Sequence, residues 1–194
     1  MNKLTKKIFL LFLISSFFIT SCATTTVITH KIGEISYEQN KKSSALILWG
    51  TAWRKDQKEV KLREEIAEKA ISNFFSKTKV FSSFKILKNV DKKSAIELSD
   101  IEALNINKES EIKYDKIIFI RVEELGPLFF INLSAILFEG YTEVKLRVRS
   151  LNTNNSALEY DTYSEWKNGN PFIIKGVKTL EEDMTENLKT IFTN

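Results

Sequence analysis

The single cysteine, Cys22, and the single histidine, His30, are the first residues to consider for chemistry. A thiol or hydroxyl nucleophile needs a base close to it, and His30 lies in a polar N-terminal stretch outside the segment expected to fold. Cys22 has no second cysteine with which to form a disulfide within the chain. The six glycines build no nucleophile elbow, phosphate-binding loop or dinucleotide fingerprint. The sequence therefore gives no catalytic constellation around a nucleophile.

Three pairs of adjacent carboxylates remain as candidates for acid–base work: Glu64–Glu65, Glu123–Glu124 and Glu181–Glu182. Adjacent residues on a strand point to opposite faces, so Glu123 and Glu124 are not expected to converge on one substrate. The other two pairs fall on the polar faces of expected helices. Zinc seldom accepts carboxylates alone, so we expect no metal and no cofactor. Hydrolysis of glycosides or peptidoglycan by two distant carboxylates stays open, but the sequence favours a protein that is not an enzyme.

The N-terminus has the build of a secretory signal over residues 1–21. Three lysines, Lys3, Lys6 and Lys7, precede an apolar run of 12 residues from Ile8 to Ile19. A helix needs roughly 20 apolar residues to cross a bilayer permanently. The run is therefore too short for a lasting transmembrane helix and indicates export of the chain.

The four residues Ile19-Thr20-Ser21-Cys22 resemble the lipobox of bacterial lipoproteins. The resemblance implies cleavage between Ser21 and Cys22 and acylation of Cys22, whose several acyl chains would hold the protein to a membrane durably. An uncleaved apolar anchor with an incidental cysteine is the alternative. Ala23 takes the place where enterobacterial lipoproteins of the inner membrane carry Asp. This implies the periplasmic face of the outer membrane, with the inner membrane as the second choice.

Residues 22–43 are polar and lack a sustained period, so they are predicted to form the lipidated N-terminus and a flexible tether. A flexible chain of this length has a typical reach of about 25 Å. A single globular domain is expected over residues 44–194. The net charge of +4 includes three lysines of the signal, which leaves 29 − 3 = 26 basic against 25 acidic groups elsewhere. Basic and acidic residues are interspersed there, so nucleic acid is not an expected partner.

The domain is expected to begin with a buried strand, because Ala45 to Trp49 is a continuous apolar run that ends at Gly50. Asp56 with Glu59 resembles a capping box at the start of a helix. A second strand is predicted over 80–87. The helix between them has apolar residues at helical spacing, namely Leu62, Ile66, Ala67, Ala70, Ile71 and Phe74.

One or two short helices are predicted within 94–112, followed by a strand over 116–122. Residues 141–151 alternate between apolar and charged side chains, which indicates a half-buried strand. A polar turn leads to a returning strand over 157–166. The chain then closes with a helix that begins at a capping box of Thr179 and Glu182. The fold class is α/β (α+β), a mixed sheet of about five strands with two to four helices packed on it. The stripe of the last helix is Val177, Leu180, Met184, Leu188 and Ile191.

Tyr114-Asp115 ahead of the strand KIIFIRV, followed by EVKLRVRSLNTNNSALEYDTYSEW, resembles a group of bacterial envelope domains. This group comprises the amino-terminal domain of the Tol-system propeller protein and the lipoproteins of curli secretion, Pel export and penicillin-binding-protein activation. The order of the aspartate and the aromatic residue is reversed here, and Asn154-Asn155 replace the usual glycine of the turn. Both asparagines tolerate a left-handed conformation. The resemblance implies domains that bind partners or form rings and catalyse no reaction.

Two apolar features are candidate interfaces. Residues 128–138 are either a strand or covering segment of the core, or an exposed segment that contacts a membrane, a partner or another copy through Phe129, Phe130 and Ile131. Trp53 lies in a polar loop, as a packing residue or as an interface anchor. We expect a lipid-anchored periplasmic protein that acts as a scaffold or assembly factor through contacts with envelope proteins or itself. A lipid-anchored hydrolase or a small-ligand-binding lipoprotein is the alternative.

Overall fold

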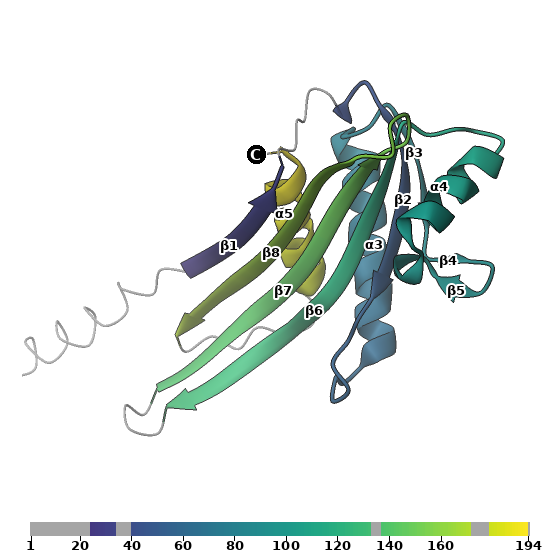
Figure 1. The fold of residues 1–194 in the computed structure, drawn as a ribbon. Helices are drawn as coiled ribbons and strands as arrows, with labels where there is room; N and C mark the ends of the chain where they lie inside the picture. The colour runs from purple at the N-terminus through teal and green to yellow at the C-terminus, as the bar shows by residue number, and fades with distance from the viewer. Residues whose placement is uncertain (1–23, 34–39, 133–136, 172–178, 194) are drawn as a thin grey trace, which may run out of the picture.

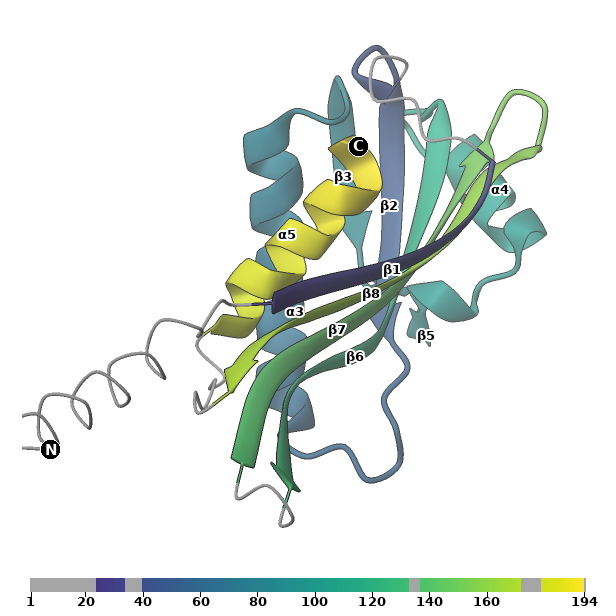
Figure 2. The same cartoon turned by 90° about the vertical axis from the view of Figure 1, so that its left-hand side faces the viewer.

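The structure is a computed structural model that describes residues 24–33, 40–132, 137–171 and 179–193. A six-stranded mixed sheet lies at its centre, with the strand order β1-β8-β7-β6-β2-β3. Helices α3 and α5 pack on one face, and the short helices η1 and α4 lie on the other (Figure 1, Figure 2). The predicted α/β class is confirmed, with six strands where about five were expected.

The elements follow one another as two parallel steps and a long antiparallel meander. Strand β2 pairs in parallel with β3 and β6, whereas β6, β7, β8 and β1 pair antiparallel. Their bounds are β1 (Thr24–Ile32), β2 (Ser44–Thr51), α3 (Val60–Thr78), β3 (Ser83–Leu87), β4 (Asn89–Val90), β5 (Lys93–Ser94), η1 (Ala95–Glu97), α4 (Asp100–Glu109), β6 (Lys116–Asn132), β7 (Leu137–Asn152), β8 (Leu158–Pro171) and α5 (Leu180–Thr193).

The main core lies between the sheet and helices α3 and α5. On β7 the alternation predicted from the sequence is confirmed, because Val144, Leu146 and Val148 are fully buried while Arg147 between them is exposed. The stripe of α5 is confirmed over its described part, and Val177 lies outside the described residues. The fully buried members of that stripe are Leu180, Met184, Leu188 and Ile191.

A second, smaller core lies on the other face, under η1 and α4. It receives the alternate residues of β2 and β6, such as Leu48 and Phe119, so these strands are buried on both faces as their continuous apolar runs predicted. Helix α4 begins with a capping box that the sequence analysis missed. Ser99 Oγ accepts a hydrogen bond from the Glu102 N–H at 3.3 Å, and the Glu102 carboxylate accepts one from the Ser99 N–H at 2.7 Å.

Strand β6 extends ten residues beyond the predicted 116–122 and so outruns its neighbour β2, which ends opposite Val122. Arg63 of α3 contacts the part of β6 that extends beyond β2, because its Nη1 donates a hydrogen bond to the carbonyl of Leu125. Arg63 is therefore buried, and Leu62, assigned to the buried stripe, is 39% exposed. That assignment was wrong because apolar spacing alone does not show which carbonyls the end of another strand leaves unpaired.

One local prediction is corrected by the backbone, and a second detail concerns a turn. Asp56 and Glu59 form no capping box: α3 begins at Val60, and Glu59 is its N-cap residue, in a left-handed conformation at φ 54° with no side-chain cap hydrogen bond. In the turn between β7 and β8 the left-handed residue is Ser156, at φ 58°, and not Asn154 or Asn155. The Asn155 side chain instead accepts a hydrogen bond from the Ala157 N–H at 3.0 Å, because a short amide side chain can replace a backbone acceptor in a turn.

The largest correction concerns the predicted tether. Residues 24–32, TTTVITHKI, form strand β1, which pairs with β8 over nine residues from Thr24–Gly169 to Ile32–Asp161. These residues are rich in β-branched side chains, which favour a strand once a partner is available. The partner strand, β8, lies far along the chain, so no local sequence pattern could predict the pairing. The folded domain therefore includes residues 24–32, which were predicted to belong to the tether.

Candidate functional site

The start of β1 and the hairpin of β6 and β7 lie at the same end of the sheet (Figure 1). Thr24 pairs with Gly169, Gly169 with Tyr141, and Tyr141 with Leu128, so these four residues form one row across four strands. The opposite end of the sheet carries the turn between β7 and β8 together with the start of β2. The chain therefore enters the domain beside the apolar segment that the sequence marked as a candidate interface.

The candidate interface residues Phe129 to Ile131 belong to β6, where their backbone pairs with residues 138–140 of β7. The first part of the apolar segment is thus a strand, which agrees with one of the two structural interpretations. The side chains of these residues lie outside the described part, and the role of the segment stays a prediction. Ser21 and Cys22 also lie outside the described residues, so cleavage and lipidation stay predictions as well.

Trp53, the other candidate, follows β2 in the loop that leads to α3. Its side chain is half-buried and packs against the main core. This burial fits the packing interpretation, because an indole held against the core has less surface left for a partner. A role for Trp53 in an interface stays a prediction.

Strand β1 forms one edge of the sheet, and no strand of the described residues pairs with its outer side. Every residue from Thr25 to Ile32 is exposed except Thr29, which is half-buried. Val27, Ile28 and Ile32 are 38%, 43% and 71% exposed. Lys31 is the one charged residue among the nine of the strand. An exposed edge strand with aliphatic side chains and little charge is a template on which a further strand can pair.

His30 lies on β1 and not in a tether, so the expectation that it stands apart from the fold was wrong. Its ring stacks on that of Tyr163 of β8, with the ring centres 6.4 Å apart. Burial and the negative charge of Glu165 raise the pKa of the Tyr163 phenol above its ordinary value. A phenol that holds its proton so firmly makes a poor nucleophile, and the pair does not supply the activated hydroxyl that catalysis needs.

The face of β7 and β8 opposite α3 and α5 carries a charge lattice, which consists of Glu143, Lys145, Glu165 and Lys167. Lys167 lies 2.5 Å from Glu165 and 3.3 Å from Glu143, and Lys145 lies 3.2 Å from Glu143. Burial disfavours the charged form of Glu165, but the hydrogen bond from Lys167 and the charges of both lysines bring the pKa of this carboxyl below its ordinary value. The two lysines and two glutamates therefore carry no net charge together.

Glu123 is the extra residue of a β-bulge, because the register passes from Val122–Leu146 directly to Glu124–Lys145. The prediction that the side chains of Glu123 and Glu124 diverge assumed strict alternation along the strand, and the bulge breaks this alternation. They still have different partners. Glu123 lies 3.5 Å from Arg121, whereas Glu124 is buried and lies 3.1 Å from Arg54. The two carboxylates do diverge as predicted, but the reason is that each has its own ion pair and not that the strand alternates strictly.

Tyr114-Asp115, which carried the resemblance to a family, is a structural junction. The Asp115 carboxylate accepts hydrogen bonds from the backbone N–H and hydroxyl of Ser44, at 2.8 and 2.9 Å. The buried Tyr114 exchanges backbone hydrogen bonds with the side-chain amide of Asn107, and its carbonyl accepts one from Thr153 at 2.7 Å. The dipeptide therefore joins the starts of β2 and β6 to α4 and to the turn after β7.

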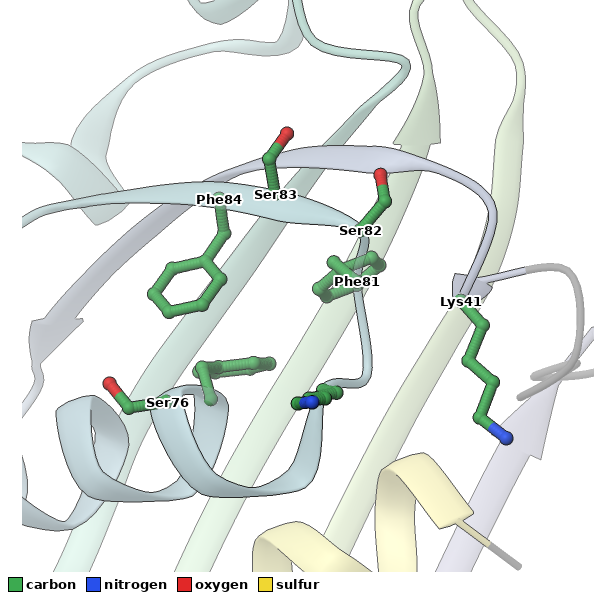
Figure 3. Close-up of a pocket in the computed structure, with 8 residues that line it drawn as sticks. Lys41, Ser76, Phe81, Ser82, Ser83 and Phe84 are labelled. Carbon is green, nitrogen blue, oxygen red and sulfur yellow. The ribbon is translucent and has the colours of Figure 1, made fainter.

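A cavity of about 550 Å³ lies beside the edge strand β3, between that strand and the end of α3 (Figure 3). Phe75, Phe81 and Phe84 line it, and Figure 3 shows Phe81 and Phe84 on the β3 side, facing the helix. The exposed Lys41 and Lys79 also line it. The lining holds three serines but neither a histidine nor a carboxylate that could act as their base. The cavity can therefore hold an apolar group but is not built for hydrolysis.

Two further properties concern the described part of the chain. None of its helices is both long and apolar enough to cross a membrane. Within the same residues, no three histidine, cysteine, aspartate or glutamate side chains lie together in a way that could hold a metal ion.

No protein-family profile matches the chain, and no curated protein is similar to it in sequence. Solved structures that are similar to it over most of its length include the following three. The PelC dodecamer of Paraburkholderia phytofirmans is 11% identical and covers 88% of this chain and 100% of its own, at a TM-score of 0.48. A single-substitution variant of that dodecamer is 10% identical, with coverage of 88% and 100% and a TM-score of 0.49. Lipoprotein GNA1162 of Neisseria meningitidis is 14% identical, covers 78% and 99%, and has a TM-score of 0.42.

PelC is the Pel-export lipoprotein of the group that the sequence resembles. The relation to the Tol-system propeller protein stays a prediction. Because one fold hosts many functions, identities of 10–14% leave the function of this chain to be argued from its own residues.

Proposed function

We propose that this chain is a lipid-anchored protein of the cell envelope that binds other envelope proteins or further copies of itself and catalyses no reaction. One observation carries the proposal. The exposed edge strand β1, whose outer side no described strand pairs, begins two residues after the cysteine predicted to be lipidated. Anchoring and partner binding thus fall on neighbouring parts of one short stretch of chain.

The position of β1 determines how an anchored domain would sit on its membrane. Cys22 is separated from Thr24 by Ala23 alone, and two residues of extended chain span at most about 7 Å. The domain would therefore lie against the membrane surface and would not stand off on a tether of 22 residues. The row from Thr24 to Leu128 places the β6–β7 hairpin at this same end. Phe129 to Ile131 would then be presented close to the lipid surface or to a partner seated on it.

The edge of β1 supplies the partner contact. The outer N–H and C=O groups of a free edge can pair with a strand of another chain, and exposed Ile28 and Ile32 add apolar contact. Because the anchor holds β1 at the membrane, a partner paired with it would be positioned at a set height above that membrane. Assembly of envelope components through recruitment and placement is the function that follows. Ala23 supports the periplasmic face of the outer membrane as the location.

A second candidate, a small-ligand-binding lipoprotein, is favoured by the cavity of about 550 Å³ beside β3. Its phenylalanine floor suits an apolar ligand such as a hydrocarbon chain. Replacing Phe84, whose ring faces the helix across the cavity (Figure 3), with Glu would place a charge in its apolar wall. If fluorescent fatty acid binds the full chain and Phe84→Glu abolishes that binding, this candidate is supported. If the dye does not bind the wild type, the candidate fails.

Replacement of the proposed lipidation site tests the anchor. Cys22→Ser is expected to leave an unprocessed precursor that carries no acyl label, since only the thiol can take the first lipid. Metabolic labelling with a fatty acid and the mass of the purified protein measure this. Normal processing and labelling of the variant would refute the lipid anchor.

Two matched lysine substitutions test the edge. Ile32 on β1 and Ile101 on α4 are 71% and 72% exposed, so each change adds one charge at an equally open site. We expect Ile32→Lys to lower the mass of the assembly of the full chain in detergent, measured by light scattering, and to abolish crosslinks to partners in cells. Ile101→Lys should change neither. A monomeric wild type without crosslinked partners, or equal behaviour of the two variants, would contradict the proposal.

A further inference from the structure

Three arginines from two neighbouring strands line one small cavity on the face of the sheet opposite α3 and α5. The cavity has a volume of about 200 Å³, and its lining consists of Arg121 on β6, Arg147 and Arg149 on β7, and the apolar side chains of Ile96 and Phe119. No carboxylate belongs to this lining. The chain as a whole is close to neutral without its signal, so the gathering of three guanidinium groups around one cavity is a local feature that the fold creates.

The strand register places two of these charges directly opposite each other. Arg121 and Arg147 are paired residues of β6 and β7, and Arg149 pairs with Phe119 one step further along the same face. Like charges at directly opposite positions destabilise a sheet. A surface selected for stability alone would place a carboxylate at one of the two positions, as happens at Lys145 and Glu165 on β7 and β8.

Each arginine has one carboxylate partner outside the cavity lining. Arg147 binds Asp161 through Nε and Nη2, at 3.0 and 2.6 Å. Arg149 binds Asp100 through Nη2 at 3.1 Å, and its guanidinium lies over the Phe119 ring at 4.8 Å. Arg121 lies 3.5 Å from Glu123. A guanidinium has five N–H donors, so these contacts orient the three side chains and leave donors for a further acceptor.

The geometry points to a binding site for a phosphate group carried by a small ester. A phosphate monoester offers three terminal oxygens and close to two negative charges, which matches three guanidinium groups better than a single carboxylate does. Ile96 and Phe119 would support the carbon skeleton of the ester. The site needs no lipidation and no partner protein, so it stands or falls independently of the proposed function.

Two sources could present such a phosphate, a soluble ester or a lipid headgroup. Arg147 lies in one row with Tyr163 and His30, six residues along β1 from Thr24, which corresponds to about 20 Å of strand. The site is thus set well back from the end at which the chain enters the domain, and a soluble ester reaches it without constraint. A lipid of the anchoring membrane reaches it only if the domain lies flat.

Calorimetric titration of the full chain in a nonionic detergent at low salt tests the site. The two ligands are glycerol 3-phosphate, a soluble monoester, and dihexanoyl phosphatidic acid, which carries a phosphate monoester headgroup on short lipid chains. Saturable binding of the first assigns the site to a soluble ester, and binding of the second alone assigns it to a headgroup. Affinity should fall as salt is added, because the contact is ionic. If neither ligand binds at millimolar concentration, the inference is overturned.

A pair of matched variants identifies the residues responsible. Arg121 and Lys189 are 51% and 58% exposed, and each has one ion pair, at 3.5 and 3.6 Å, but Lys189 lies on α5 across the sheet. Arg121→Gln should weaken binding about tenfold or more, as loss of a charged hydrogen bond does, and should leave the melting temperature unchanged or raised, because the repulsion from Arg147 disappears. Lys189→Gln should keep the affinity within about twofold. Equal affinities of the two variants would overturn the assignment.

Discussion

The two faces of strands β7 and β8 are formed by alternating residues, but the faces differ in composition and in burial. The face toward α3 and α5 holds fully buried aliphatic residues such as Leu146 and Val148. The opposite face holds Arg147 and Lys167, which are 52% and 36% exposed, and carboxylate partners that are 13% and 14% exposed. Apolar burial contributes far more to stability than exposed ion pairs do. We therefore expect the helix-covered face to carry the stability of the domain and the opposite face to be free for recognition.

The largest effect should come from the core of the helix-covered face. Phe75 is 1% exposed, and its ring packs 5.0 Å from Phe74 and 5.3 Å from Phe192, measured between ring centres. Phe75→Ala should lower the free energy of unfolding by about 3–5 kcal/mol, because it leaves a cavity that the packed rings cannot close. Urea denaturation measures this loss. Leu62→Ala on the same helix is the control, and a loss comparable with that of Phe75→Ala would contradict the assignment of stability to the core.

A buried ion pair should give the next largest effect. Lys116 Nζ lies 2.8 Å from Glu159 Oε2, with side-chain exposures of 9% and 23%. Glu159→Gln should cost about 2–3 kcal/mol at neutral pH, since the buried ammonium loses its counter-charge. Glu186→Gln, which breaks the exposed pair with Lys189, is the control and should cost less than about 0.5 kcal/mol.

The stabilisation that Glu159 provides should decrease as the pH falls. Burial disfavours the charged form of Glu159, but hydrogen bonds from Lys116 and Ser150 bring the pKa of its carboxyl below the ordinary value. The folded state therefore favours the ionised form. Its stabilisation is fully present above the unfolded-state pKa of about 4.3 and is lost as the pH falls through the lower folded value. Denaturation at several pH values should show wild type and Glu159→Gln converging in acid, and a constant difference would refute this linkage.

An intermediate effect is expected where α4 covers the second face. Ser99→Ala should cost about 1 kcal/mol, as removal of an N-cap hydroxyl usually does. The backbone N–H and the hydroxyl of Ser99, together with Lys93, lower the pKa of the Glu102 carboxyl to about 2. The cap therefore acts above the unfolded-state pKa and is lost as the pH falls toward 2. Carboxyl titration by NMR should show this low pKa in the wild type and a rise in Ser99→Ala; an unchanged value would rule out the capping box.

The smallest effect is expected within the charge lattice of the uncovered face. A double-mutant cycle of Glu165→Gln and Lys167→Gln should give a coupling energy of at most about 1 kcal/mol. The coupling should shrink as salt is added, because the charges are partly exposed and screened. Thermal unfolding of the four proteins at low and high salt measures it. A coupling as large as the loss in Phe75→Ala would show that both faces carry stability, and the comparison of the faces would fail.

Much of the fold could be predicted because its signals are local. The alternation of β7 indicates which residues are buried, since successive side chains of a strand point to opposite faces. The stripe of α5 predicts Leu180, Met184, Leu188 and Ile191 for the same kind of reason, and all four are buried. The prediction failed at Arg63, where the deciding contact is a hydrogen bond to the carbonyl of Leu125 on β6, 62 residues away.

The sequence by itself predicted an export signal and a lipidation site at Cys22, and it determined the periods of the main helices and strands. Each of these features is encoded by residues that are neighbours along the chain. Only the tertiary structure decided that residues 24–32 are an edge strand, that the chain enters beside the β6–β7 hairpin, and that Arg121, Arg147 and Arg149 line one cavity. The physical reason is the register of the sheet, which joins Thr24 to Gly169 and Arg121 to Arg147 through backbone hydrogen bonds that no short stretch of sequence encodes.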